Sequence, residues 1–342
     1  MRNRTGMLWG WFVMGFLTTL MGQEKPVAGY PPGVVDLLYP SPGDQSEQHT
    51  LFWAPESKKG PAPLLVALHT WSSDYRQAER GYADWCQAQG WVFLHPDFRG
   101  PNKTPPAMGS ELMVADVLGA VAWAREKTPV DADRIYVVGV SGGGHAAMLL
   151  AGRAPELWAG VSAWCGISDI ARWHAQRGGD KYSKDIEKAL GGNPGTDPEK
   201  AAEAARRSPL TWLAKAAGVP LDLCHGVQDG RTGSVPFSHS LNAFNAVVPV
   251  GDRLAPEWIE GVYARPEQLG DPLQDTLYSP RAVRFRKISG NTRVTLFEGG
   301  HEILLQPALN WLAAQRKGQP VNWDPPKSAE LKASEADKQS GK

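Results

Sequence analysis

The stretch that decides the fold is RIYVVGVSGGGHAAMLL, residues Arg134–Leu150. A β-branched apolar run ends at Gly139, one serine follows at position 141, and three glycines then lead into alanines and leucines. The first half is typical of a buried strand and the second half of a helix. Gly139 to Gly143 fit the pattern G-x-S-x-G, in which glycines beside the serine let the chain turn sharply without a Cβ clash. The pattern predicts Ser141 as a nucleophile.

A glycine-rich turn between a strand and a helix could instead hold a phosphate group at the helix N-terminus. A phosphate loop would end in lysine followed by serine or threonine, and a dinucleotide fold would need an acidic residue about 20 residues further on. The stretch has neither feature. The nucleophile interpretation is therefore favoured over the phosphate loop.

Apolar runs of strand length recur along the chain and are separated by amphipathic stretches with helical periodicity. The strand-like runs are PLLVALHT, WVFLHPD, RIYVVGV, GVSAWCG, PLDLCHG and TRVTLFEG. The helical stretches are Asp74–Gln89, Glu111–Lys127, Gly142–Arg153, Ser234–Val247 and His301–Gln315. This alternation predicts an α/β fold with a mostly parallel central sheet and helices on both faces. VVDLLYP and HTLFWAP should form a leading antiparallel hairpin.

We predict one domain over residues 30–318, with two interruptions. Residues 168–217 are polar, rich in glycine and partly helical, which indicates a small cap inserted after a strand. Residues 249–290 carry scattered prolines and charges and suggest a looser loop excursion over the surface. Residues 319–342 are polar and charged towards their end and are expected to be a disordered tail.

The N-terminus predicts export from the cytoplasm. Arg2 and Arg4 precede an apolar run, MLWGWFVMGFLTTLMG, that ends in small and polar residues. A positive segment followed by a short apolar one is typical of a secretory signal peptide, here residues 1–22. The alternative is an uncleaved membrane anchor, because the run is close to the shortest that spans a bilayer. We expect cleavage, a secreted or periplasmic protein, and no stable membrane anchor afterwards.

Charge and cysteine content exclude some classes of partner and cofactor. Lysine plus arginine and aspartate plus glutamate are both 36, so no net positive field favours nucleic acid. The three cysteines lack metal-site spacing; they allow one disulfide, but buried free thiols are the simpler interpretation. We expect no metal and no organic cofactor. The sequence leaves the oligomeric state open.

A serine nucleophile requires a base, and the base requires an acid that fixes its tautomer. In a strand–turn–helix arrangement of this kind the chain order is serine, acid, histidine. Asp229 lies in a loop after a predicted strand, and His301 follows the last predicted strand at the start of a helix. We predict these two as acid and base. Asp222 and Glu302 are the alternative acids, while His145, His174 and His239 are expected to be structural.

The reaction also requires an oxyanion hole of backbone N–H donors. One donor should be Gly142, directly after the nucleophile, and the other should come from the loop after the first predicted parallel strand. That loop reads His69-Thr70-Trp71, and we assign the second donor to Trp71. Thr70 stands where glycine is usual in such loops.

From about Pro61 to Gln315 the chain resembles the α/β-hydrolase superfamily, in particular the catalytic domain of prolyl-oligopeptidase-type serine hydrolases and related secreted esterases. The resemblance rests on HPDFRGP, DADRIYVVGVSGGGHAAML, RRSPLTW, HGVQDGRTGSVP and EGGHE. It implies Ser141 as nucleophile, Asp229 as acid and His301 as base. Two departures stand out: residues 23–60 are too few for the β-propeller of those peptidases, and 72 residues, an unusually long connection, separate acid from base.

Substrate predictions start from the 14 tryptophans. Trp71 near the predicted oxyanion hole, with Trp164 and Trp173 around the cap, could stack on a sugar or an aromatic ring. We therefore expect a carboxylic ester hydrolase acting on a small-molecule or polysaccharide-linked ester, such as an acetyl or feruloyl esterase. The resemblance implies a second reading, a peptidase or aminoacyl-ester hydrolase. The third is a catalytically silent α/β-hydrolase that serves as a binding protein.

Overall fold

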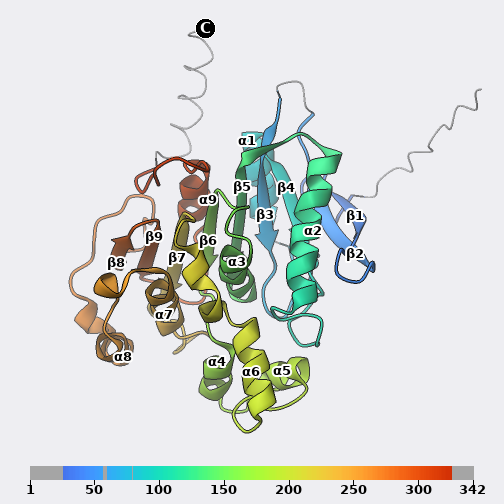
Figure 1. Ribbon diagram of the computed structural model, residues 1–342. Coiled ribbons are helices and arrows are strands. Elements are labelled where there is room, and N and C mark those ends of the chain that lie inside the picture. The colour runs from blue at the N-terminus through green and yellow to red at the C-terminus, as the bar shows by residue number, and fades with distance from the viewer. Residues whose placement is uncertain (1–25, 57–59, 79, 326–342) are drawn as a thin grey trace, which may run out of the picture.

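One mixed β-sheet runs through the middle of the protein (Figure 1). The structure is a computed structural model that describes residues 26–56, 60–78 and 80–325. The strands are β1 (Val35–Pro40), β2 (Glu47–Trp53), β3 (Ala62–Leu68), β4 (Val92–Pro96), β5 (Val130–Val140), β6 (Gly160–Trp164), β7 (Leu221–Gly226), β8 (Val283–Ser289) and β9 (Thr292–Phe297).

The strand order across the sheet is β1-β2-β4-β3-β5-β6-β7-β9-β8. The six inner strands from β4 to β9 pair in parallel, whereas β1, β2 and β8 join through antiparallel pairs. The predicted mostly parallel sheet and the leading hairpin are thereby confirmed. Because parallel strands end at the same edge, the loops that follow β3, β5, β7 and β9 meet there.

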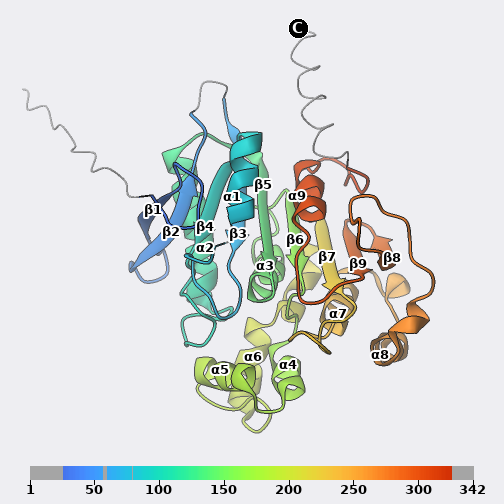
Figure 2. The same cartoon turned by 180° about the vertical axis from the view of Figure 1, so that it is seen from behind.

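Two layers of helices cover the two faces of the sheet (Figures 1 and 2). One face carries α2 (Glu111–Lys127), α3 (Gly142–Arg153) and α7 (Ser238–Val247), and the other carries α1 (Arg80–Gln89) and α9 (Leu305–Ala313). The alternation of side chains along each strand separates the two cores: in β3, Leu64 and Val66 pack on the first face and Leu65 on the second. The fold is that of an α/β-hydrolase.

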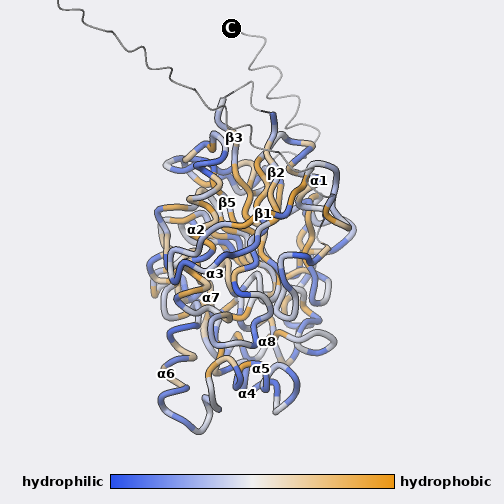
Figure 3. Tube along the Cα trace, turned by 90° about the vertical axis from the view of Figure 1, so that its right-hand side faces the viewer, coloured by the Kyte–Doolittle hydropathy of each residue, from blue (hydrophilic) through white to orange (hydrophobic). Residues whose placement is uncertain are grey.

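A small cap covers the carboxyl edge of the sheet, as predicted for residues 168–217. It consists of α4 (Ile170–Arg177), α5 (Lys181–Leu190) and α6 (Pro198–Arg207). Each helix starts at an aspartate whose carboxylate accepts backbone N–H bonds, namely Asp169, Asp180 and Asp197. The cap has its own apolar cluster, which packs onto the loops of the sheet. In Figure 3 the hydrophobic colour follows the strands, and α6 is largely hydrophilic.

Some predicted boundaries are wrong. The excursion 249–290 contains helix α8 (Pro256–Ala264) and strand β8, which pairs with β9 at the edge of the sheet. Three helices start later than predicted: α1 at Arg80, α7 at Ser238 and α9 at Leu305.

The predicted tail begins too early. Trp323 stacks on Trp311, with ring centroids 5.6 Å apart, and the amide of Gln315 donates to the carbonyl of Asn322 at 2.8 Å. The chain is therefore packed at least to these positions. The predicted signal peptide, residues 1–22, and the rest of the tail, residues 326–342, lie outside the described residues. Among the helices that are described, none has the length and apolar character needed to cross a bilayer.

Buried histidines predict a loss of stability in mild acid. Desolvation lowers the pKa of His145 to about 4 and the pKa values of His95 and His239 to about 3. Below about pH 6.5 the unfolded chain binds protons that the native state does not. The free energy of unfolding therefore decreases as the pH is lowered, and at pH 5 each histidine has reduced it by about 2 kcal/mol relative to neutral pH. Urea unfolding at pH 7 and pH 5 measures this. In His239→Gln the pH-dependent loss should shrink by one histidine's share; an unchanged loss would contradict the assignment.

Candidate active site

The predicted nucleophile sits on a strained turn between β5 and α3. Ser141 has φ 60° and ψ −118°, a conformation that L-residues rarely adopt, and its N–H donates to the carbonyl of Trp164 at 2.9 Å. A Cβ on Gly139 would lie 2.4 Å from the backbone of Gly143. Gly139, two residues before the serine, is thus required because the backbone of Gly143 leaves no room for a side chain, as the G-x-S-x-G pattern implies.

The predicted acid and base meet across the loops that follow β7 and β9. His301 Nδ1 lies 2.6 Å from Asp229 Oδ2. Asp229 is fully buried, and its Oδ1 accepts hydrogen bonds from the N–H groups of Gly230 at 2.9 Å and Val235 at 3.0 Å. Burial would raise the pKa of the Asp229 carboxyl, but hydrogen bonds from His225 and His301 outweigh it and hold that pKa well below its usual range. The carboxylate is ionised and directed at the imidazole.

Ser141 and His301 line the same cavity, of about 340 Å³. The other lining residues come from the loop after β3, the end of β5, the cap and the chain that follows the histidine: Thr70, Trp71, Ser72, Val140, Tyr182, Glu302 and Ile303. His301 Nε2 is 3.4 Å from the hydroxyl of Ser234, a long hydrogen bond. The nucleophile and the base therefore face one space that an acyl group can enter.

Backbone donors for an oxyanion lie next to the nucleophile. A Cβ on Gly142 would be 2.5 Å from the backbone nitrogen of Trp71, so these two peptide units are almost in contact. Gly142 opens α3, where the first N–H groups have no acceptor within the helix. Thr70, the departure from the usual glycine, is anchored by Gln77 Oε1, which accepts from its N–H and its hydroxyl at 2.9 Å each. The loop is fixed despite the substitution.

The tryptophans predicted to bind substrate are placed differently. Trp71 borders the cavity, but its side chain is almost wholly buried and packs edge-to-face on Trp173. Trp164 and Trp173 are fully buried, and their indole N–H groups donate to Ser162 Oγ and the carbonyl of Ser234. The prediction that Trp164 and Trp173 bind substrate is wrong, because neither ring has exposed surface for stacking.

The alternative acids have other partners. Asp222 is buried and forms a two-pronged ion pair with Arg293, at 2.8 and 3.0 Å. Glu302 lines the cavity, and its carboxylate accepts from the guanidinium of Arg281 at 3.1 Å. Their hydrogen bonds go to groups other than the His301 ring, whereas Asp229 bonds to that ring directly.

The three histidines expected to be structural have ring partners other than the Ser141 side chain. His145 Nδ1 is 2.9 Å from the carbonyl of Ile167, His174 Nε2 is 2.8 Å from Glu187, and His239 Nε2 is 2.9 Å from Gln176. Their contacts agree with the structural roles expected for them.

The ion pair of Asp222 gives a stability prediction. Asp222→Asn should lower the free energy of unfolding by about 3 kcal/mol, because it leaves the buried guanidinium of Arg293 without a compensating charge. Urea unfolding measures the loss. The kcat of the folded fraction should stay at the wild-type level, and a selective loss of kcat would instead assign a catalytic role to Asp222.

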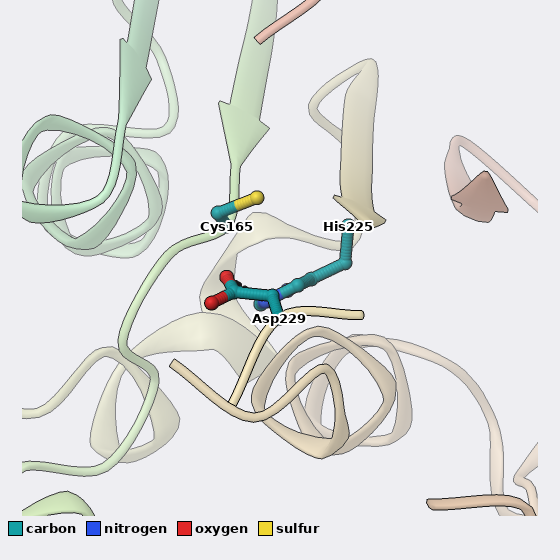
Figure 4. Close-up of side chains that lie close together, drawn as sticks. All are labelled: Cys165, His225 and Asp229. Atoms are coloured by element: carbon teal, nitrogen blue, oxygen red, sulfur yellow. Dashed lines mark hydrogen bonds and ion pairs between the residues drawn. The ribbon is translucent and has the colours of Figure 1, made fainter. Parts of the chain in front are cut away.

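Three residues around the acid were missed by the sequence analysis: Cys165, His225 and Ser234. Cys165 Sγ, His225 Nε2 and a carboxylate oxygen of Asp229 lie within 4.8 Å of one another (Figure 4), a set that could in principle bind a metal ion. However, His225 already bonds to the carboxylate, and burial raises the pKa of the Cys165 thiol, which opposes metal binding. The set fits a hydrogen-bond network better than a metal site.

A spacing signal could have found one of the three. His225 precedes Asp229 by four residues at the end of a buried strand, so the two side chains flank one tight turn. Cys165 and Ser234 carry no comparable signal, because their proximity to His301 depends on how separate loops pack.

Comparison with known proteins gives both sequence and structural matches. The sequence profile of the prolyl oligopeptidase family matches residues 81–255. The dipeptidyl aminopeptidase BIII of Pseudoxanthomonas mexicana is 27% identical over 229 residues, which cover 60% of this chain and 31% of that protein. The chain thus spans about a third of the length of this relative.

Two solved structures share the fold. The acylaminoacyl peptidase of Pyrococcus horikoshii superimposes with a TM-score of 0.55 at 14% identity, covering 85% of this chain and 43% of that one. A thermostable esterase superimposes with a TM-score of 0.50 at 16% identity, covering 83% of this chain and 63% of that one. At such low identity the likeness shows the fold alone. The family profile, by contrast, matches just over half of the sequence, and the chain belongs to the prolyl oligopeptidase family of α/β-fold serine hydrolases.

Proposed function

We propose that the protein cleaves short peptidyl or N-acylated aminoacyl substrates through an acyl-enzyme on Ser141. The observation that carries this proposal is the 2.6 Å contact between Asp229 and His301, whose ring borders the cavity that also holds Ser141. Membership of the prolyl oligopeptidase family and the similarity to a dipeptidyl aminopeptidase support an amide bond as the target.

The proposed reaction has two half-reactions. Ser141 Oγ attacks the substrate carbonyl while His301 Nε2 takes its proton, and Asp229 stabilises the imidazolium through the Nδ1–H bond. The N–H groups of Gly142 and Trp71 receive the oxyanion. The imidazolium then protonates the leaving amine. In the second half-reaction a water molecule, deprotonated by His301, attacks the acyl carbon, and the proton returns to Ser141.

The wall of the cavity favours acyl groups without a free ammonium. Glu302 is the one carboxylate among the residues that line the cavity, and Arg281 already neutralises it at 3.1 Å. A substrate amine would therefore have to displace this ion pair. An N-acylated or otherwise neutral substrate meets no such cost, which is why we favour it over a substrate with a free amino terminus.

The second candidate function is carboxylic ester hydrolysis, including the acetyl or feruloyl esters of polysaccharides. The same wall, whose one carboxylate is already paired with Arg281, is the observation that favours it, because esters need no anchoring charge. The burial of Trp164 and Trp173 removes the argument for aromatic stacking on a sugar, so we rank this function second.

A substrate panel separates the two functions. Purified protein is assayed on N-acetyl-alanine p-nitroanilide, alanine p-nitroanilide, methyl ferulate and acetylated xylan. We expect the highest kcat/KM on the N-acetylated anilide. If methyl ferulate or acetylated xylan were hydrolysed and the anilides were not, the second function would replace the first. Failure of a fluorophosphonate probe to label Ser141 would favour a catalytically silent binding protein.

We also propose that the protein acts outside the cytoplasm, as a secreted or periplasmic hydrolase. The support is the charged and then apolar pattern of residues 1–22. N-terminal sequencing of the protein from cell-free medium or periplasm tests this; an N-terminus that still carries residues 1–22 would contradict cleavage.

A further inference from the structure

A second imidazole shares the carboxylate of the catalytic acid. His225 is the fifth residue of β7 and is fully buried. Its Nε2 lies 2.9 Å from Asp229 Oδ2, the same oxygen that His301 Nδ1 approaches at 2.6 Å. One carboxylate oxygen of Asp229 therefore bridges two histidines, of which only His301 borders the cavity.

The partners of His225 determine which of its nitrogens carries the proton. Nε2 faces two acceptors, Asp229 Oδ2 and the carbonyl of Val235 at 3.0 Å, so it must be protonated. Nδ1 lies 2.8 Å from the hydroxyl of Ser240, which can donate to it. A neutral ring with its proton on Nε2 satisfies every one of these contacts. The two acceptors at Nε2 thus fix the tautomer that donates to the acid, and the Ser240 hydroxyl, which can donate or accept, is compatible with it.

The neighbouring thiol belongs to the same network. Cys165 follows β6 with φ 47°, and its Sγ lies 3.7 Å from the carbonyl of Gly300 and 3.5 Å from that of Glu302, the residues on either side of His301. It therefore contacts the base loop, while His225 contacts the acid (Figure 4).

We propose that His225 is a positioning residue for the reaction proposed above: it holds the Asp229 carboxylate in place and draws part of its negative charge away from His301. The inference rests on the proposed function, since it assigns His225 to the same Asp229–His301 pair. It extends that function by a fourth side chain.

The test compares His225→Leu, which removes the donor, with His225→Gln, whose amide reaches the same position and can still donate. In His225→Leu we expect kcat to fall about ten- to a hundredfold, because the carboxylate loses a charge-assisted hydrogen bond. The acidic limb of the pH–kcat/KM profile should move to higher pH by about one unit, because the full charge of Oδ2 then favours the protonated His301. His225→Gln should recover most of both changes.

The matched control is His239→Leu, which removes a similarly buried histidine whose ring is hydrogen-bonded to Ser168 and Gln176 instead of Asp229. It should leave the limb where it is. An unmoved limb in His225→Leu, or an equal shift in His239→Leu, would overturn the inference. The proposed function is tested separately, by fluorophosphonate labelling and substrate turnover of the wild-type protein. A failure of the proposed function can therefore be distinguished from a failure of the role proposed for His225.

A spectroscopic measurement keeps the inference testable if His225→Leu does not fold. In ¹⁵N-histidine-labelled wild-type protein, His225 should be neutral with its proton on Nε2. Ser240→Ala removes the partner of Nδ1 and leaves both acceptors of Nε2, so the proton should stay on Nε2 in this variant as well. A wild-type His225 protonated on Nδ1 alone would refute the proposal.

Discussion

Replacement of Ser141 by alanine is expected to lower kcat on every accepted substrate by a factor on the order of 10⁶, because an acyl-enzyme can no longer form. The side chain is small and 7% exposed, so the substitution removes one oxygen and leaves the turn intact. The Tm should change little, because the hydroxyl of Ser141 does not cap the helix that it precedes.

Steady-state kinetics and fluorophosphonate labelling measure the loss. Ser72→Ala is the matched control, because Ser72 is another serine in the wall of the same cavity and its hydroxyl bonds to Lys181 of the cap at 3.2 Å. This control should keep both labelling and turnover. If Ser141→Ala retained activity while Ser72→Ala lost it, the nucleophile would have to be reassigned.

Asp229→Asn should lower kcat by roughly 10⁴-fold, because the amide cannot stabilise the imidazolium and its NH₂ group favours the wrong tautomer of His301. Both oxygens of this carboxylate are hydrogen-bonded. One accepts from the N–H groups of Gly230 and Val235, and the other contacts the imidazoles of His225 and His301. Kinetics at pH 7 measure the effect, with Asp222→Asn as the buried-aspartate control.

The lowered pKa of Asp229 also sets its contribution to stability. The pKa of the native carboxyl lies below its unfolded value of about 3.9, so this stabilisation is complete above about pH 5 and is lost progressively as the pH falls through the unfolded value towards the native one. Asp229→Asn should therefore destabilise the protein at pH 7 and have a smaller effect in strong acid. Equal kcat losses in Asp229→Asn and Asp222→Asn would contradict the assignment of the acid.

The sheet and the nucleophile turn were predictable because their signals are local. Buried parallel strands are continuous apolar runs, and the G-x-S-x-G turn lies between one of them and a helix. Strand β8 was missed because its sequence, VRFRKIS, mixes three basic residues with apolar ones and lacks a regular alternation, and the strand pairs with β9 alone at the edge of the sheet. A charged edge strand is half-exposed and resembles a surface loop in composition.

The residues around the acid and base could be predicted only in part. Chain order was enough to select Asp229 and His301, and the structure brings them into contact. The surroundings of an aromatic ring, by contrast, depend on which loops pack over it. Trp164 and Trp173 were predicted to bind substrate, although both are fully buried.

The cap is tied to the catalytic loop by one carbonyl group. Trp173 Nε1 and Arg177 Nη1, both on α4, donate to the carbonyl of Ser234 at 2.8 and 3.1 Å, while the hydroxyl of the same residue lies 3.4 Å from His301 Nε2. A cap that lifted as a lid would pull Ser234 away from the base. Ser234 therefore links the position of α4 to the immediate surroundings of the catalytic base.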